Sequence, residues 1–163
     1  MGGTMDGLPR EARKLLEGWP VVIRLPVQWG EMDAYGHVNN VVFFRYFESA
    51  RIRYLEACGF TDTYHEQGVG AILHSTSARF RRPLFHPDEV AVGARVSDLG
   101  EDRFTMEYRV VSVDQEAVAA EGQGLVVSYD YEAGRKAPLP DTVVEGVRRL
   151  RPGSGDSSGD HGT

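Results

Sequence analysis

The clearest feature of the chain is a change of hydrophobic period near position 70. Between Asn39 and Gly59, apolar residues recur at helical spacing: Phe43, Tyr46, Phe47, Ala50, Tyr54, Ala57 and Cys58. Asn39 or Asn40 can cap the start of such a helix, and Gly59 can end it. We therefore expect one long helix whose apolar face lies in the core.

After a polar loop, the apolar residues alternate with a period of two, which is typical of strands. The alternation predicts four consecutive strands, at 71–82, 89–98, 103–113 and 117–131. A further apolar run at 21–27 precedes the long helix, and Pro26 within it indicates an edge strand or a bend. Gly122 and Gly124 in the last strand indicate a bulge or the close approach of another group.

Short helices are expected at both ends, from Pro9 to a stop at Gly18 and over 141–150. We divide the chain into an N-terminal extension (1–19), one domain (20–150) and a Gly/Ser/Asp-rich tail (151–163) predicted to be disordered. A long apolar helix must be covered, and a curled antiparallel sheet is the simplest cover. The fold class is therefore α+β.

Composition narrows the function. The 163 residues contain 18 basic and 24 acidic side chains, a net charge of −6, which disfavours binding to nucleic acid or to an anionic membrane. No apolar stretch approaches the length of a membrane span, and the start of the chain lacks a secretory signal, so we expect a cytoplasmic protein. The five histidines and one cysteine lack metal-ligand spacing, and no nucleotide-binding glycine motif occurs, so neither a metal nor a cofactor is expected.

The loop before the long helix carries the candidate chemistry. Asp33 supplies a carboxylate, Gly36 permits a tight bend, and the helix start near Asn40 offers unpaired backbone N–H groups for a developing oxyanion. A carboxylate beside an oxyanion site suffices for acyl transfer without a metal. The alternative is a plain turn in which Asp33 bends the chain and Asn39 caps the helix.

This loop and helix resemble a known family. The run Asp33-Ala34-Tyr35-Gly36-His37-Val38-Asn39-Asn40, followed by Phe43, Tyr46, Phe47 and Glu48, is similar to hotdog-fold acyl-CoA thioesterases of the 4-hydroxybenzoyl-CoA thioesterase type. Weaker similarities follow in the family's order, at 80–84, 88–90 and 134–140. The resemblance covers roughly residues 20–142.

The resemblance implies a hotdog fold, a five-stranded antiparallel sheet wrapped around one long helix, with active sites at a subunit interface. It implies that Asp33 is the catalytic carboxylate and that a backbone amide at about Asn40 polarises the thioester carbonyl. The other residues of the motif are then candidates for substrate contact: Gly36, His37, Val38 and Asn39. A homodimer or homotetramer and an acyl-CoA substrate are the expected partners.

Several alternatives stay open. Asp33 either attacks the carbonyl or activates a water, and the carrier is either CoA or an acyl carrier protein. A hotdog hydratase or dehydratase would need the side chains of Asp33 and His37 to converge. A non-catalytic acyl-CoA-binding module would need neither of these two residues for chemistry. Arg81 and Arg82 are candidates for the CoA phosphates or are solvated strand-end charges. We expect Cys58 to be a buried structural thiol.

Overall fold

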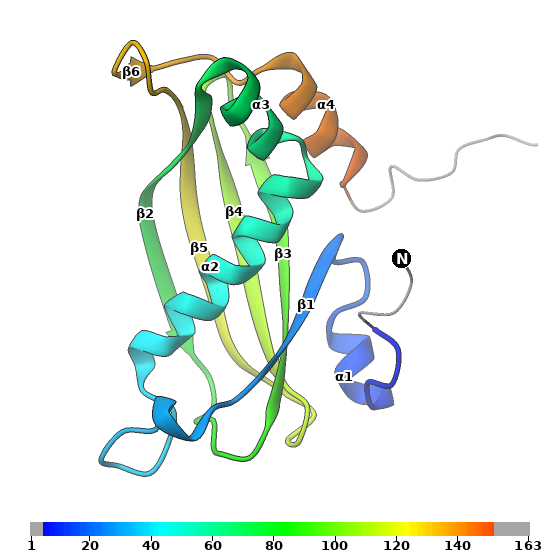
Figure 1. Cartoon of the computed structure of the whole chain (residues 1–163). Helices are drawn as coiled ribbons and strands as arrows, with labels where there is room; N and C mark the ends of the chain where they lie inside the picture. The colour runs from blue at the N-terminus through cyan, green and yellow to red at the C-terminus, as the bar shows by residue number, and fades with distance from the viewer. Residues whose placement is uncertain (1–4, 152–163) are drawn as a thin grey trace, which may run out of the picture.

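A computed structural model describes residues 5–151 as a curled antiparallel sheet closed around one long helix (Figure 1). The helix is α2 (Asn40–Ala57), and it lies along the concave face of the sheet. The five long strands are β1 (Val21–Pro26), β2 (Val69–Phe80), β3 (Glu89–Leu99), β4 (Arg103–Ser112) and β5 (Ala117–Asp130). This arrangement confirms the expected α+β hotdog fold.

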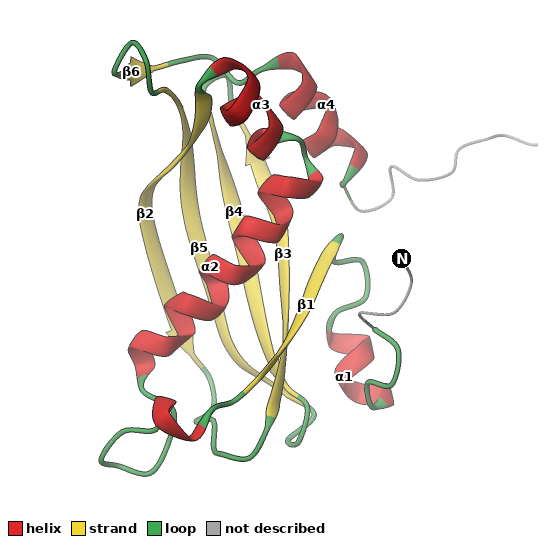
Figure 2. Cartoon of the chain, in the orientation of Figure 1, coloured by secondary structure: helices red, strands yellow, loops and turns green. Residues whose placement is uncertain are grey.

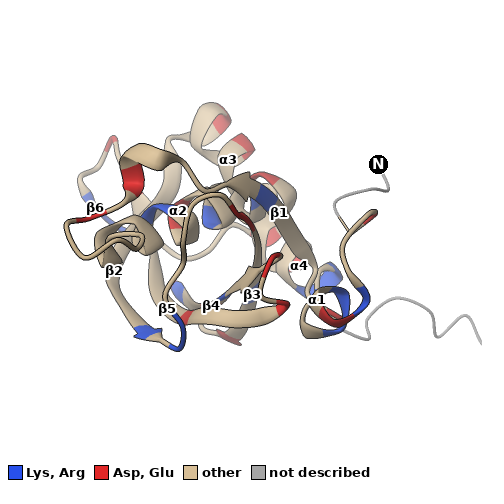
Figure 3. Cartoon of the chain, turned by 90° about the horizontal axis from the view of Figure 1, so that it is seen from below, with Lys and Arg blue, Asp and Glu red and all other residues tan. Residues whose placement is uncertain are grey.

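The strands lie in the order β1-β3-β4-β5-β2, all antiparallel, and the two-residue β6 (Arg135–Lys136) pairs with β5 (Figure 2). β1 and β2 are therefore the edges, as Pro26 indicated for β1. Seen from below, the strands surround α2 in an arc (Figure 3).

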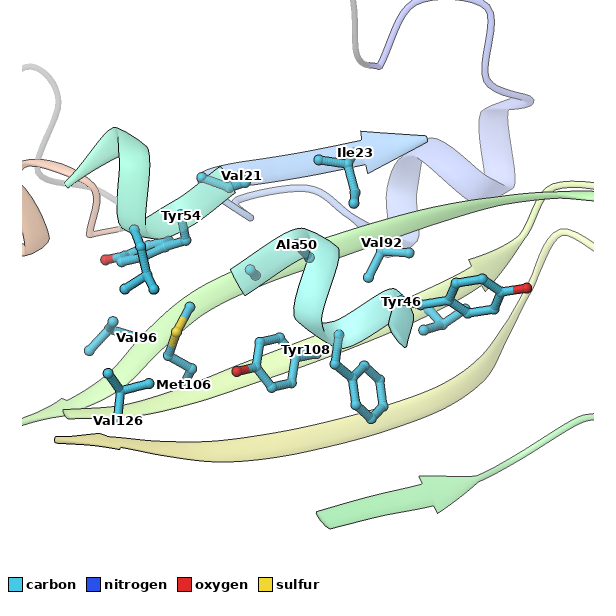
Figure 4. Packing of buried hydrophobic residues seen from close by; sticks show 14 of the residues in the cluster. Val21, Ile23, Tyr46, Ala50, Tyr54, Val92, Val96, Met106, Tyr108 and Val126 are labelled. Atoms are coloured by element: carbon cyan, nitrogen blue, oxygen red, sulfur yellow. The ribbon is translucent and has the colours of Figure 1, made fainter. Parts of the chain in front are cut away.

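The core forms because one face of α2 meets the inner face of the sheet (Figure 4). On β4, four alternate residues, Phe104, Met106, Tyr108 and Val110, are all buried, as the period of two predicted. Gly122 lies beside the ring of Phe47, and a Cβ at that position would lie 2.5 Å from that ring. The glycine in β5 thus makes room for an aromatic side chain of α2.

Three short helices complete the described chain: α1 (Arg10–Leu15), α3 (Phe60–Gln67) and α4 (Asp141–Arg149). The helices at either end confirm the sequence prediction, but the polar loop expected after α2 is wrong, because α3 lies there. α3 is one-sided: only Phe60 and Thr63 are buried, and glycines in the left-handed conformation bound it at both ends. With so few buried positions, the sequence of α3 shows no helical periodicity of apolar residues and therefore predicts a loop there.

The N-terminal extension covers part of the outer, convex face of the sheet. A second apolar cluster joins Leu8, Ala12, Leu16 and Trp19 of the extension to Val22, Ala91 and Val111 of the sheet. Figure 3 shows α1 outside the arc of strands. The predicted disordered tail lies, apart from Arg151, outside the described residues. No helix in residues 5–151 is long and apolar enough to cross a membrane.

Candidate functional site

The loop before α2 is held by one carboxylate at its start. A single-turn 3-10 helix, η1 (Trp29–Glu31), ends at Glu31, whose side chain accepts hydrogen bonds from the Gln28 backbone N–H (2.7 Å) and the Tyr46 hydroxyl (3.2 Å). Burial and the Glu31 charge raise the pKa of Tyr46 well above its usual value, so this hydroxyl stays a donor. The Glu31 carbonyl accepts from the Asn39 N–H at 2.9 Å. These bonds fasten both ends of the loop to each other and to α2.

Asp33 lies in a tight turn inside this frame. Its backbone N–H donates to the His37 carbonyl at 2.9 Å, and its carbonyl accepts from the Gly36 N–H at 3.1 Å. Gly36 has a φ of +82°, which an L side chain rarely adopts. One carboxylate oxygen of Asp33 accepts from the Tyr35 N–H at 2.8 Å, and the other lies 3.6 Å from His37 Nδ1. The carboxylate and the imidazole therefore converge, as the hydratase alternative required.

The start of α2 leaves one donor unused. Asn39 is the N-cap, and its side-chain oxygen accepts from the Val41 N–H at 3.1 Å. The Val42 N–H donates to the Asn39 carbonyl at 2.9 Å. The Asn40 N–H has no acceptor within residues 5–151. Because the helix N-terminus carries partial positive charge, this N–H suits a carbonyl oxygen that gains negative charge.

A pocket of about 290 Å³ opens directly at this helix start. We call it the reaction pocket, and it joins the loop, the first turn of α2 and the end of β2: His37, Val38, Asn40, Phe43, Phe80, Arg81, Arg82 and Pro83 line it. Phe43 and Phe80 pack edge to face, with ring centroids 5.2 Å apart. Residues far apart in the chain thus form one site because β2 runs back along α2.

The predicted site residues divide between the pocket wall and its support. His37, Val38 and Asn40 line the reaction pocket, whereas Asp33, Gly36 and Asn39 do not. Gly36 and Asn39 act instead on the shape of the turn and the helix start. The Asp33 carboxylate lies 3.6 Å from Nδ1 of the pocket-lining His37, and the Asp33 side chain is 23% exposed.

The two arginines at the end of β2 differ in their surroundings. Both line the reaction pocket. Arg81 donates to Glu121 at 3.2 Å, whereas the Arg82 side chain makes no hydrogen bond or ion pair within the described chain. Arg82 is therefore the arginine whose charge is available to a ligand in this pocket.

Cys58 has the structural role predicted for it. Its side chain is 1% exposed, and burial raises the pKa of the thiol to about 11, so the thiolate that a nucleophile requires is scarce at neutral pH. Sequence reasoning missed Phe80 and Pro83 as lining residues. The period of two in β2 gave only a weak indication of a role for Phe80. Strand periodicity does not identify which distant residues pack against the last side chain of a strand.

A second pocket lies at the opposite end of β2. It has a volume of about 240 Å³ and is mainly apolar and aromatic, lined by Leu55, Phe60, Thr61, Tyr64, Ala71 and Tyr131. Between the two pockets, residues 73–77 of edge strand β2 are exposed. Among residues 5–151 this strand pairs only with β5, so no other described strand covers its outer edge.

Comparison with known proteins identifies relatives across most of the chain. The family model described as the thioesterase-like superfamily matches residues 27–147. A thioesterase of Thermus thermophilus, solved in complex with coenzyme A and Zn, is 37% identical over 82% of this chain and 96% of that one, with a TM-score of 0.71. An esterase candidate of Aquifex aeolicus (strain VF5) is 30% identical over 77% of this chain and 96% of its own length. An acyl-acyl carrier protein thioesterase of Arabidopsis thaliana is 27% identical over 74% of this chain and 64% of its own.

Proposed function

Because the chain belongs to the thioesterase-like superfamily, we propose that it hydrolyses an acyl-CoA to the free acid and CoA in the reaction pocket. The observation that carries the proposal is the Asn40 N–H at the start of α2, which has no acceptor within residues 5–151. It belongs to a pocket-lining residue, and another lining residue, His37, lies 3.6 Å from the Asp33 carboxylate. An N–H in this position at the helix start can donate to a thioester oxygen that gains negative charge in the reaction. A positioned donor of this kind is worth about 10²–10³ in rate.

Asp33 supplies the negative charge for the chemical step. As general base it removes a proton from the water that attacks the thioester carbon, and the thiolate of CoA then leaves and takes up a proton. As nucleophile it attacks that carbon itself, the C–S bond breaks, and the CoA thiolate leaves and takes up a proton. Water then cleaves the resulting anhydride to the free acid and the Asp33 carboxylate. Asp33 does not line the reaction pocket, which favours the first route, since a water molecule can bridge the gap between the carboxylate and a thioester in the pocket.

The open edge of β2 supports a homodimer. A long exposed edge is a template for pairing with another strand, and a second copy covers it without a change of fold. When two β2 strands pair antiparallel about a two-fold axis, the Phe80 end of one lies beside the Ala71 end of the other. The reaction pocket then meets the apolar pocket of the second copy, whose aromatic side chains suit the acyl group.

The direct test is release of free thiol from a panel of acyl-CoAs that differ in chain length and aromaticity. Turnover of at least one thioester, with loss in Asp33→Asn, supports the proposal. Binding of acyl-CoA without thiol release by the wild type would instead indicate a non-catalytic module.

A second candidate is addition or removal of water on an acyl thioester that stays intact. The 3.6 Å approach of Asp33 to His37 favours it, since such a reaction uses a carboxylate–imidazole pair. Free CoA separates the two functions, because only hydrolysis releases it. Mass spectrometry of the thioester after incubation detects the change of one water that hydration or dehydration would give.

A further inference from the structure

The described chain has a larger polar pocket outside the reaction pocket. It lies on the outer face of the sheet and has a volume of about 440 Å³. We call it the outer-face groove. Its charged lining comprises four arginines, Arg79, Arg81, Arg95 and Arg109, and two glutamates, Glu107 and Glu121.

Positive charge is in excess in this groove, although the whole chain has a net charge of −6. Glu121 accepts hydrogen bonds from both Arg81 (3.2 Å) and Arg109 (3.1 Å), and Glu107 accepts one from Arg95 (3.3 Å). Arg79 makes no ion pair or side-chain hydrogen bond within residues 5–151. Four guanidiniums against two carboxylates leave two positive charges to be balanced by a ligand, and guanidinium matches the geometry of phosphate.

The N-terminal extension holds two of the arginines in place. The Trp19 ring stacks with both, its centroid 4.1 Å from the Arg95 guanidinium carbon and 5.2 Å from that of Arg109. Arg109 also donates to the Leu15 carbonyl at 2.9 Å. Gly93 lies under the indole, and a Cβ there would be 2.8 Å from the ring. Cations held in this way lose little conformational freedom when an anion binds.

The groove adjoins the reaction pocket. Arg81 lines both, and Arg79 and Arg82 lie on either side of it along the end of β2. Two residues, Phe80 and Arg81, separate Arg79 from Arg82 in the chain. Figure 3 shows basic segments where β2 ends. A ligand with its acyl end at Asn40 therefore passes Arg82 and Arg81 before it reaches the groove.

We propose that the outer-face groove binds the phosphates at the nucleotide end of a CoA thioester whose acyl end occupies the reaction pocket. This proposal rests on the proposed function, because it places the two ends of one substrate in the two pockets. It also selects the carrier. CoA presents a 3′-phosphate and a diphosphate to the groove, whereas the phosphopantetheine of an acyl carrier protein presents a single phosphodiester.

The first experiment measures binding separately from turnover. Isothermal titration calorimetry of the full chain with adenosine 3′,5′-bisphosphate, which has no thioester, is compared for wild type, Arg79→Gln and the control Arg135→Gln. Arg135 carries the same charge and is exposed on β6, outside both pockets. Arg79→Gln should weaken binding about ten-fold or more, since a hydrogen bond to a charged group is lost. The control should stay within about two-fold of wild type.

A second measurement does not depend on any variant. Raising the ionic strength from about 0.05 to 0.5 M should weaken binding of the bisphosphate to the wild type, because salt screens exposed charges. If the wild type does not bind the bisphosphate, or if Arg79→Gln binds it as the wild type does, the proposal is overturned.

The third measurement compares kcat/KM for one acyl group on CoA and on pantetheine. The wild type should prefer the CoA thioester, and Arg79→Gln should reduce that preference about ten-fold. Equal kcat/KM for both thioesters in the wild type would overturn the groove proposal and leave hydrolysis intact. Bisphosphate binding without any thiol release would keep the groove and reject the proposed function. A preference for acyl carrier protein thioesters that Arg79→Gln abolishes would show that the groove binds a carrier protein, against the proposal.

Discussion

Replacing Asp33 by Asn removes one charge from the candidate site and changes little else. The amide oxygen of asparagine can still accept the hydrogen bond from the Tyr35 N–H, and the backbone bonds of the turn do not involve the side chain. A charge-assisted hydrogen bond becomes a neutral one, which costs about 1 kcal/mol. For a chain of this size, that lowers the melting temperature by roughly 2–4 °C, so the variant stays folded at assay temperature.

The chemical step should suffer far more than the fold. General-base help is worth about 10²–10⁴ in rate, or about 2.7–5.4 kcal/mol of transition-state stabilisation. We therefore expect kcat to fall at least a hundred-fold, while KM changes little because Asp33 does not line the reaction pocket. His37→Ala should be milder, since His37 lines the reaction pocket but takes no part in the chemical step of the proposed hydrolysis.

The assay is steady-state turnover on the best wild-type thioester, with thermal melts to confirm folding. Asp98→Asn is a matched control, since Asp98 is exposed on β3 and has no described side-chain partner. If folded Asp33→Asn keeps wild-type kcat, the mechanism is refuted. Glu48, the carboxylate of the helix motif, does not replace Asp33: Glu48 is exposed about 12 Å along α2 from Asn40 and does not line the reaction pocket.

Three further predictions address packing, pH and assembly. Gly146→Ala should lower the melting temperature by several degrees, because its Cβ would lie 2.2 Å from the Cys58 carbonyl oxygen; Gly30→Ala, in open space, is the control. Burial opposes ionisation of Glu121, but hydrogen bonds from two arginines outweigh this effect and lower the pKa of the carboxyl. The ionised Glu121 therefore stabilises the folded state fully above its unfolded pKa, and this contribution is lost as pH falls through the lower folded pKa. Melting curves between pH 6 and 3 should therefore show a steeper acid loss for wild type than for Glu121→Gln; equal slopes would contradict this. Light scattering over a range of concentrations should give a dimer or tetramer, and a persistent monomer would reject pairing through β2.

Local patterns determined most of the architecture. The helical spacing of apolar residues in α2 and the period of two in the strands follow from backbone geometry over a few residues, so both can be identified without tertiary information. Pro26 indicated an edge strand for the same reason: it lacks the N–H that a central strand needs. The short motif around Asp33 likewise indicated the turn and the helix cap.

Tertiary structure decided which groups share a site. The pairing of Phe43 with Phe80, and the contrast between paired Arg81 and unpaired Arg82, depend on strand register and on side chains distant in sequence. α3 exists because α2 and β2 supply a surface for its two buried side chains, which its own sequence does not reveal. The outer-face groove needs the extension folded onto β3 and β4, and no pattern near Trp19 indicates that contact. Short-range preferences specify elements, whereas a site arises from long-range packing that brings together residues far apart in the chain.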